Sequence, residues 1–303
     1  MRKRYTPPTS IFQNTDNTPK CYISGKDSTN TLCNISTHNT LNDYQICKFE
    51  FCSFISVSSD NTNGGAIFFH RTESTSLETS LTVNNCFFLS CKANNGNPNL
   101  SSGGVSARYV SDVTITSCFF KQCESSGTGG LFLQHLSHQP SISECTFYTC
   151  RCPKTGAGAY VGYCALEVSP VFCYDCRFLK GEPIINEEYS LAGGGLSLSS
   201  DTSNRANTIV NVIFAYNRAI NGGGLSIYQR SGLTPSVKFC FFSENTVTNK
   251  GHDINLSEVN ENPLFRCFTY TTQTTTLFVN PPYQSTPESP GTSTPNWLPH
   301  ACN

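Results

Sequence analysis

The sequence predicts an all-β protein, a right-handed, single-stranded parallel β-helix (a solenoid) of about seven coils. Two observations predict this fold: a short Cys/Phe motif recurs along the chain, and a Gly-Gly motif alternates with it in a constant order. The composition agrees with them. The 303 residues are rich in Thr, Ser, Asn and Gly, and only 14% are charged, which favours short strands and tight turns over helices.

The Cys/Phe motif consists of an apolar residue, Cys, Phe and a second Cys or Asn, at steps of three, two and three residues. Its Phe positions are Phe49, Phe88, Phe120, Phe147, Phe178, Phe214 and Phe242. The first Cys position defines one row, Cys47, Cys86, Cys118, Cys145, Cys176 and Cys240. The last position is held by Cys52, Cys91, Cys123 and Cys150, and in the two final copies by Asn217 and Asn245. A step of three between inward positions predicts a backbone corner.

The Gly-Gly motif is followed by alternating apolar residues. Its pairs are Gly64 and Gly65, Gly103 and Gly104, Gly129 and Gly130, Gly194 and Gly195, and Gly223 and Gly224. Leu196 and Leu198 alternate with small polar residues, which predicts a strand with one buried face. We expect the glycines to permit positive φ angles and close backbone approach where a coil bends.

These motifs together predict one coil of two or three strands per repeat. Coils stack at roughly 4.8 Å, so equivalent residues form rows along the solenoid. We expect the Phe residues to form one buried aromatic ladder, and Asn217 and Asn245 to form an amide row at a corner. A leucine-rich repeat horseshoe is the main rival fold, but the sequence lacks its Leu-x-x-Leu-x-Leu frame.

Four segments follow from the repeat boundaries. Residues 1–41 are expected to form an N-terminal cap or an irregular first coil, and residues 42–262 the repeats. Residues 263–280 are β-prone and are expected to provide a closing strand. Residues 281–303 are rich in Pro, Ser and Thr, which predicts an extended, disordered tail.

The repeats resemble those of polymorphic outer membrane proteins. The resemblance is carried by GGAI at residues 64–67 and by Phe-x-x-Asn at residues 214–217 and 242–245, with GHDI at residue 251 resembling the close of such arrays. It covers roughly residues 42–256. Four copies have Cys where the family motif has Asn, and no autotransporter barrel follows. The family occurs in chlamydial adhesins and protist surface proteins. The resemblance implies surface exposure or secretion, and adhesion to a host or cell-surface protein or glycan.

The bulk properties exclude several classes of function. A formal net charge of −1 offers no basic field for nucleic acid. No apolar run is long enough to span a membrane, and the basic first residues precede no apolar segment of a secretory signal. No cofactor and no metal site are predicted.

Three interpretations of the cysteine rows are open. In the first interpretation, the cysteines are buried thiols that pack as small hydrophobic groups. Stacked neighbours also lie within the range of a disulfide, which would require export from the cell. Metal binding is the third, although no third and fourth ligand recurs. The group Cys150, Cys152, Cys164, Cys173 and Cys176 is denser than the rest and is a candidate for a local disulfide or metal site.

Two further sets of residues are candidates for local sites. His135 and His138 form a His-x-x-His pair that we expect in a solvated loop. Asn34, Asn99 and Asn255 begin acceptor sequences for N-glycosylation, and two of the three are expected in positions that a loop exposes.

A non-enzymatic binding protein is the first functional hypothesis. Binding would use an exposed face or the loops 52–64 and 91–103. A carbohydrate-active enzyme, a polysaccharide lyase or glycoside hydrolase, is the alternative, because this fold carries both. Such an enzyme needs clustered carboxylates, whereas Glu187 and Glu188 adjoin in a loop-like stretch. Asp60, Asp112, Asp201 and Asp253 share no repeat register. A redox protein would need exposed thiols in electropositive surroundings.

Overall fold

The structure is a computed structural model of the whole chain. It describes residues 20–24, 33–35, 39–40, 46–59, 64–70, 78–94, 101–153, 156–163, 167–168, 171–174, 177–178, 193–200, 207–229, 236–250, 253–257, 264–266, 269–270 and 277–280. The predicted 281–303 tail and Cys164 and Cys176 lie outside the described residues. Within the described residues there is no helix long and apolar enough to cross a membrane.

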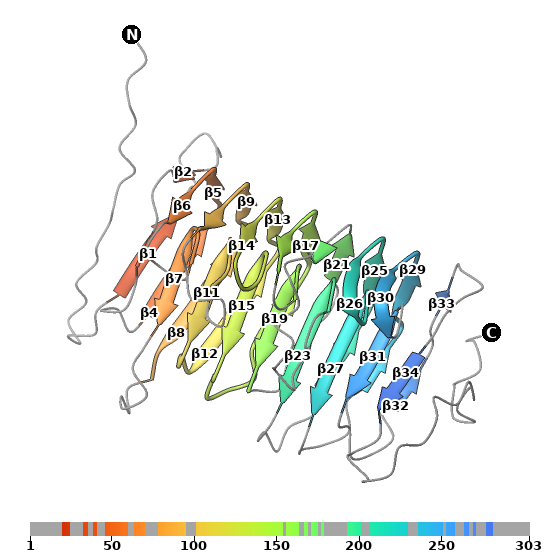
Figure 1. The fold of residues 1–303 in the computed structure, drawn as a ribbon. Coiled ribbons are helices and arrows are strands. Elements are labelled where there is room, and N and C mark those ends of the chain that lie inside the picture. The colour runs from red at the N-terminus through yellow and green to blue at the C-terminus, as the bar shows by residue number, and fades with distance from the viewer. Residues whose placement is uncertain are drawn as a thin grey trace.

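The described strands form four parallel sheets, which we call sheets A to D (Figure 1). Sheet A contains β1 (Lys20–Ser24), β4 (Ile46–Glu50), β8 (Ser80–Asn84), β12 (Asp112–Thr116), β16 (Ser141–Ser143), β20 (Glu167–Val168), β24 (Thr208–Val210), β28 (Ser236–Lys238) and β32 (Leu264–Arg266). Sheet B contains β2 (Cys33–Ile35), β5 (Cys52–Ile55), β9 (Phe87–Leu89), β13 (Phe119–Lys121), β17 (Cys145–Tyr148), β21 (Val171–Tyr174), β25 (Val212–Ala215), β29 (Phe241–Ser243) and β33 (Thr269–Tyr270).

The other two sheets complete each coil. Sheet D contains β6 (Ser58–Ser59), β10 (Lys92–Ala93), β14 (Glu124–Ser125), β18 (Arg151–Cys152), β22 (Arg177–Phe178), β26 (Arg218–Asn221) and β30 (Thr246–Lys250). Sheet C contains β3 (Asn39–Thr40), β7 (Ile67–His70), β11 (Val105–Arg108), β15 (Leu131–Gln134), β19 (Ala159–Gly162), β23 (Leu196–Ser200), β27 (Leu225–Gln229), β31 (Ile254–Ser257) and β34 (Leu277–Asn280).

The chain runs through the sheets in the order A, B, D, C and then climbs to the next coil. The strands therefore stack as a right-handed parallel β-helix, with the colour passing from red to blue along its axis (Figure 1). Seven coils contribute a described strand to all four sheets, in keeping with the predicted number. Each coil has four strands rather than two or three, because a two-residue strand of sheet D often precedes the Gly-Gly segment. Strands β1–β3 and β32–β34 extend the solenoid at its two ends.

The predicted aromatic ladder lies in the core under sheet B. Phe54, Phe88, Phe120 and Phe147 stack in series, with ring centroids 4.7, 4.6 and 4.8 Å apart and planes within 10°. Further along, Phe214 stacks on Phe242 at 5.0 Å. All these rings are buried, so the rows supply most of the large apolar groups of the core.

The predicted register of the first repeat is wrong by five residues. Phe54, not Phe49, pairs with Phe88, whereas Phe49 lies in sheet A opposite Val83. Cys52 therefore belongs to the first cysteine row, and Cys47 lies in sheet A opposite Leu81. Residues 44–52 and 49–57 both match the motif by spacing. The second register is the one that pairs β4, β5 and β6 with β8, β9 and β10 of the next coil.

The predicted register of the fifth repeat is also wrong. Cys173 lies between Phe147 and Phe214, and Val171 takes the place assigned to Cys176. Phe178 belongs to sheet D, where it pairs with Cys152. The aromatic ladder is thus interrupted by a thiol, which packs as a small apolar group at this coil.

Non-glycine residues in the left-handed region make the corners. Asn85 and Ser117 have φ angles of 51° and 52° immediately before the first motif cysteine, and Ser90 and Gln122 have 53° and 55° before the second. Such a residue reverses the side-chain alternation, which explains the three-residue steps of the motif. The predicted corners are therefore confirmed.

Close backbone approach explains the paired glycines. A Cβ atom on Gly104 would lie 2.6 Å from the Gly130 carbonyl oxygen and 2.8 Å from the Phe120 ring. Among the described glycines only Gly222 has a positive φ, so the expectation of positive φ at the Gly-Gly pairs is wrong. The Gly64–Gly65 pair lies one residue earlier in its coil than the Gly103–Gly104 pair does in the next coil. Gly64 is opposite Ser102, and Ala66 is opposite Gly104.

The predicted amide row at the corner between sheets B and D is present. The Asn217 side-chain amide donates to the carbonyl oxygen of Cys173 at 2.9 Å and to the Asn245 Oδ1 at 3.0 Å. Asn245 in turn donates to the Phe214 carbonyl at 2.9 Å and to the buried Asp253 carboxylate at 2.9 Å. A buried acid of the GHDI segment therefore terminates the row.

Cysteine replaces Asn in this row because a thiol can donate in the same direction. Cys91 Sγ lies 3.4 Å from the Phe54 carbonyl oxygen, and Cys150 Sγ lies 3.5 Å from that of Phe120. These are the carbonyls of the ladder position one coil earlier, as for Asn217 and Asn245. The thiol makes the weaker bond of the two.

Asn217→Ala is expected to lower the free energy of unfolding by about 2–3 kcal/mol, because the Cys173 carbonyl and the Asn245 Oδ1 lose a buried donor. Asn217→Cys, which keeps a donor, is expected to cost less than half as much. Urea unfolding of the three proteins measures both values. Equal costs for the two variants would show that the hydrogen bond is not what the position requires.

Candidate functional site

The described motif cysteines lie inside the solenoid. The first row is Cys52, Cys86, Cys118, Cys145 and Cys240, and the second contains Cys91, Cys123 and Cys150. All of them are buried and carry free thiols. No disulfide joins the cysteines whose side chains the structure describes, and no group of metal-ligating side chains occurs among the described residues. Cys150, Cys152 and Cys173 of the dense group are likewise buried and in no disulfide.

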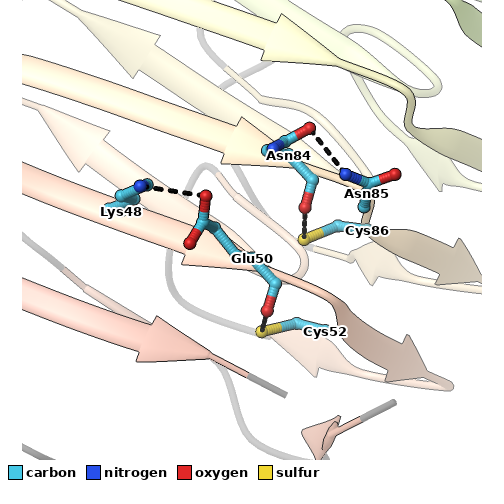
Figure 2. A network of polar contacts seen from close by, with 6 residues as sticks. All are labelled: Lys48, Glu50, Cys52, Asn84, Asn85 and Cys86. Atoms are coloured by element: carbon cyan, nitrogen blue, oxygen red, sulfur yellow. Dashed lines mark hydrogen bonds and ion pairs between the residues drawn. The ribbon is translucent and has the colours of Figure 1, made fainter. Parts of the chain in front are cut away.

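The first row bonds to the backbone across each corner. Cys52 Sγ lies 3.2 Å from the Glu50 carbonyl oxygen, and Cys86 Sγ lies 3.3 Å from that of Asn84. Figure 2 shows these two contacts pointing inward, while the Lys48–Glu50 ion pair of 2.9 Å lies on the outer side of sheet A. The thiols therefore satisfy carbonyls at the turn from sheet A to sheet B.

Burial makes these thiols poor nucleophiles. It raises the pKa of Cys86, Cys118, Cys123 and Cys173 well above the usual value, and the pKa of Cys240 to about 12. The neighbouring thiols of Cys91 and Cys150 raise the pKa of Cys123 further, and at Cys118 the Cys145 thiol raises the pKa whereas the Cys86 thiol lowers it. A redox or nucleophilic role requires an accessible thiolate, so the arrangement is that of core packing.

The structure separates the two histidines of the His-x-x-His pair. His135 is not in a solvated loop: it occupies the corner after β15 with a φ of 52°, half-buried, stacked 4.9 Å from Tyr109 and 4.3 Å from Tyr163. His138 is exposed, and its Nδ1 lies 2.9 Å from Asp112 Oδ1. The two side chains therefore have different partners.

The described carboxylates do not form a catalytic pair. Asp112 is exposed beside His138, and Asp253 is buried at the end of the amide row. Asp60, Asp201, Glu187 and Glu188 lie outside the described residues. So do residues 60–63 and 95–100 of the two candidate binding loops, whereas 52–59 belong largely to β5 and β6.

One glycosylation candidate is inaccessible in the fold. Asn255 is 5% exposed in β31, and its amide donates to Ser226 Oγ at 3.3 Å, so the expectation of a loop position is wrong there. Asn34 lies in β2, where its backbone pairs with Ser53, and Asn99 lies outside the described residues.

An apolar surface, absent from the sequence-based predictions, covers the outer face of sheet B. Alternation along each strand sends one Phe inward to the ladder and its neighbour outward. We call the outward apolar set the sheet B surface: Ile55, Phe87, Leu89, Phe119, Tyr148, Ile213 and Phe241. Ile55 is 44% exposed, and the other members are partly exposed.

The sheet B surface is ordered like the core ladder. Phe87 and Phe119 stack at 5.4 Å with an interplanar angle of 15°, and the Lys121 ammonium lies 5.6 Å from the Tyr148 ring centroid. The corner residues Phe239 and Tyr216, 56% and 44% exposed, add aromatic groups at its two edges. Exposed apolar groups gathered on one sheet face in this way are typical of interaction sites on soluble proteins.

The outer faces of two other sheets differ in character. Sheet A presents Thr82, Thr114 and Ser141 in one row. On sheet C the outward residues Ser106, Phe132 and Ser197 are 1% exposed or less. Of these three sheets, only sheet B therefore has an exposed apolar outer face among the described residues. The Phe-Phe doublets at residues 87–88, 119–120 and 241–242 were the sequence signal for it.

Comparison with known proteins agrees with the geometry. A family model described as a right handed beta helix region matches residues 99–275. No curated protein and no solved structure shows significant similarity to the chain.

Proposed function

Since the chain belongs to the right-handed β-helix family, we propose that it is a non-enzymatic, adhesin-like binding protein of the cell surface. The sheet B surface is the observation that carries this proposal. Exposed Ile55 and the partly exposed rings of Phe87 and Phe119 stand on a rigid sheet, which is where aromatic anchors of protein interfaces are found. The partner is an apolar patch of another protein.

Membership of the polymorphic outer membrane protein group is part of the proposal. The Asn of each Phe-x-x-Asn sequence is buried and bonds to a backbone carbonyl one coil away, so the motif has a structural reason to recur. Proteins with these repeats are exposed on cell surfaces, which supports the proposed location. Antibody staining of intact, unpermeabilised cells of the source organism tests it, and staining only after permeabilisation would contradict it.

A scaffold rather than an enzyme is favoured by the chemistry of the described residues. The thiols are buried and protonated, and Asp112 and Asp253 have separate structural partners. A glycosidase requires two carboxylates facing one bond. We therefore assign the sheet B surface to binding and no described residue to catalysis.

The double variant Phe87→Ser/Phe119→Ser is expected to lower adhesion about tenfold or more, since loss of a buried aromatic anchor typically costs over 1 kcal/mol. Beads that carry the full chain would be applied to cultured epithelial monolayers and to immobilised matrix proteins, and bound beads counted. Thr82→Ala/Thr114→Ala, on the outer face of sheet A, is the matched control. Equal adhesion of the two double variants, or no adhesion of the unmodified chain, contradicts the proposal.

A further inference from the structure

A row of four basic residues and one acid runs along sheet D, and those of its side chains that the structure describes lie on the outer face. Lys92, Glu124, Arg151, Arg177 and Arg218 occupy the same register position in five successive strands, β10, β14, β18, β22 and β26. We call this set the sheet D row. Parallel pairing separates neighbours by roughly 4.8 Å, so residues far apart in sequence form a straight line along the solenoid.

The charges of the sheet D row are only partly compensated. The Lys92 Nζ lies 3.6 Å from the Glu124 Oε2, so the two charges at the N-terminal end of the row neutralise each other. Arg151 and Arg218 are exposed, and among the described residues no carboxylate forms an ion pair with either of them. The other acid near this corner is Glu244, which accepts a hydrogen bond from the Tyr216 hydroxyl at 3.2 Å. In the strand between them, the backbone of Arg177 pairs with those of both Arg151 and Arg218.

We propose that the sheet D row binds a linear acidic polysaccharide that carries one carboxylate or sulfate per sugar. Arg151 and Arg218 lie two coils apart, roughly 9.6 Å along the axis, which is about the length of two pyranose residues. Alternate acid groups of an extended chain therefore meet the two exposed guanidinium groups. A guanidinium presents a planar pair of donors to a carboxylate or sulfate. Tyr216, 44% exposed two residues before Arg218, offers a ring beside the same track.

Charge density favours a polysaccharide over nucleic acid. B-form DNA carries one negative charge per about 1.7 Å of its helix axis, a far denser array than one line of arginines can match. The chain also has a net charge of −1, so it lacks the broad positive field that nucleic acid binding uses. The row lies on a different sheet from the sheet B surface, and each proposal can therefore fail without the other.

The test measures binding of the full chain to polygalacturonate, to chondroitin sulfate, to neutral dextran and to a single-stranded DNA oligomer. The unmodified chain is expected to bind both acidic polysaccharides, with affinity that falls as salt rises, and not to bind dextran. Arg151→Gln/Arg218→Gln is expected to weaken binding at least tenfold. Lys48→Gln/Lys238→Gln, which removes the same charge from sheet A, is expected to change it less than twofold.

Stability supplies a readout that does not depend on the choice of polysaccharide. Without ligand, Arg151→Gln/Arg218→Gln is expected to leave the urea midpoint almost unchanged, as for most exposed side chains, so that lost binding reports on the arginines and not on unfolding. Equal loss of binding in the two double variants, tighter binding of DNA than of either acidic polysaccharide, or no binding of any probe overturns the proposal.

Discussion

Phe120→Ala is expected to lower the free energy of unfolding by about 3–5 kcal/mol. The Phe120 ring is fully buried, stacks on Phe88 at 4.6 Å and on Phe147 at 4.8 Å, and contacts Gly104 of the adjoining sheet. Its removal opens a cavity between three coils, in a part of the core where backbone packing leaves no side chain at Gly104 to fill it. Urea unfolding monitored by circular dichroism measures the loss.

Phe119→Ala is the matched control for this experiment. Phe119 is the preceding residue of the same strand, and its partly exposed ring points outward as part of the sheet B surface. Its loss is expected to cost less than about 1 kcal/mol, as for most surface substitutions. Similar costs for Phe119→Ala and Phe120→Ala would show that the ladder ring is not packed in the core.

Coil stacking also predicts where the loss appears. In a solenoid each coil contacts only its neighbours, so stability is close to a sum of coil and interface terms. Phe120→Ala weakens the two interfaces on either side of its coil. Hydrogen exchange should therefore accelerate first in β9, β13 and β17, and later in β25 and β29.

The fold could be predicted because its inward positions repeat. Phe88, Phe120, Phe147, Phe214 and Phe242 recur with fixed spacing to their neighbours, and each occupies its expected place. The three-residue steps correctly located the corners, because one left-handed residue such as Asn85 or Ser117 changes the alternation.

The register errors have a physical cause that no local motif contains. Residues 44–57 satisfy the same spacing twice, five residues apart, and only the pairing of β4, β5 and β6 with β8, β9 and β10 distinguishes the two. Cys173 replaces Phe in the ladder because a thiol is small and apolar enough for the core, so a search for Phe moved the fifth repeat to Phe178.

The candidate surfaces depend on outward positions, which the core motif does not constrain. Arg151, Arg177 and Arg218 are separated by loops of unequal length, and they form a line only once each strand is paired with the next. The same holds for Phe87 and Phe119 on sheet B. Sequence periodicity therefore predicts which residues form the interior of a solenoid, but not which residues lie side by side on its surfaces.

Alkaline pH is expected to unfold the protein through its buried thiols, at a lower pH than ionisation of Lys and Tyr alone would require. Burial raises the pKa of Cys86, Cys118, Cys123, Cys173 and Cys240, while each has an ordinary value near 9.0 when the chain is unfolded. Above pH 9 the unfolded state therefore binds fewer protons than the folded state, and stability must fall as pH rises. Below pH 9 both states hold these protons, and these thiols add no pH dependence.

The size of the effect follows from the number of thiols. Each contributes a slope of about 1.4 kcal/mol per pH unit, so five give about 7 kcal/mol per unit between pH 9 and the raised pKa values. A domain of ordinary stability, about 5–15 kcal/mol, would unfold within one to two units above pH 9. Urea unfolding in the presence of a phosphine reductant at pH 7, 8, 9, 9.5 and 10 measures the slope.

Two variants assign this slope to the thiols rather than to Lys or Tyr. Cys118→Ala should reduce the slope by about 1.4 kcal/mol per pH unit, because it removes one thiol that ionises only in the unfolded state. Ile115→Val, a buried neighbour in β12 without a thiol, should lower stability by about 0.5–1.5 kcal/mol at every pH and leave the slope unchanged. A slope that is the same in Cys118→Ala as in the unmodified chain would mean that this thiol ionises in the folded state. The thiol rows would then be open to solvent, and the packing role assigned to them would be wrong.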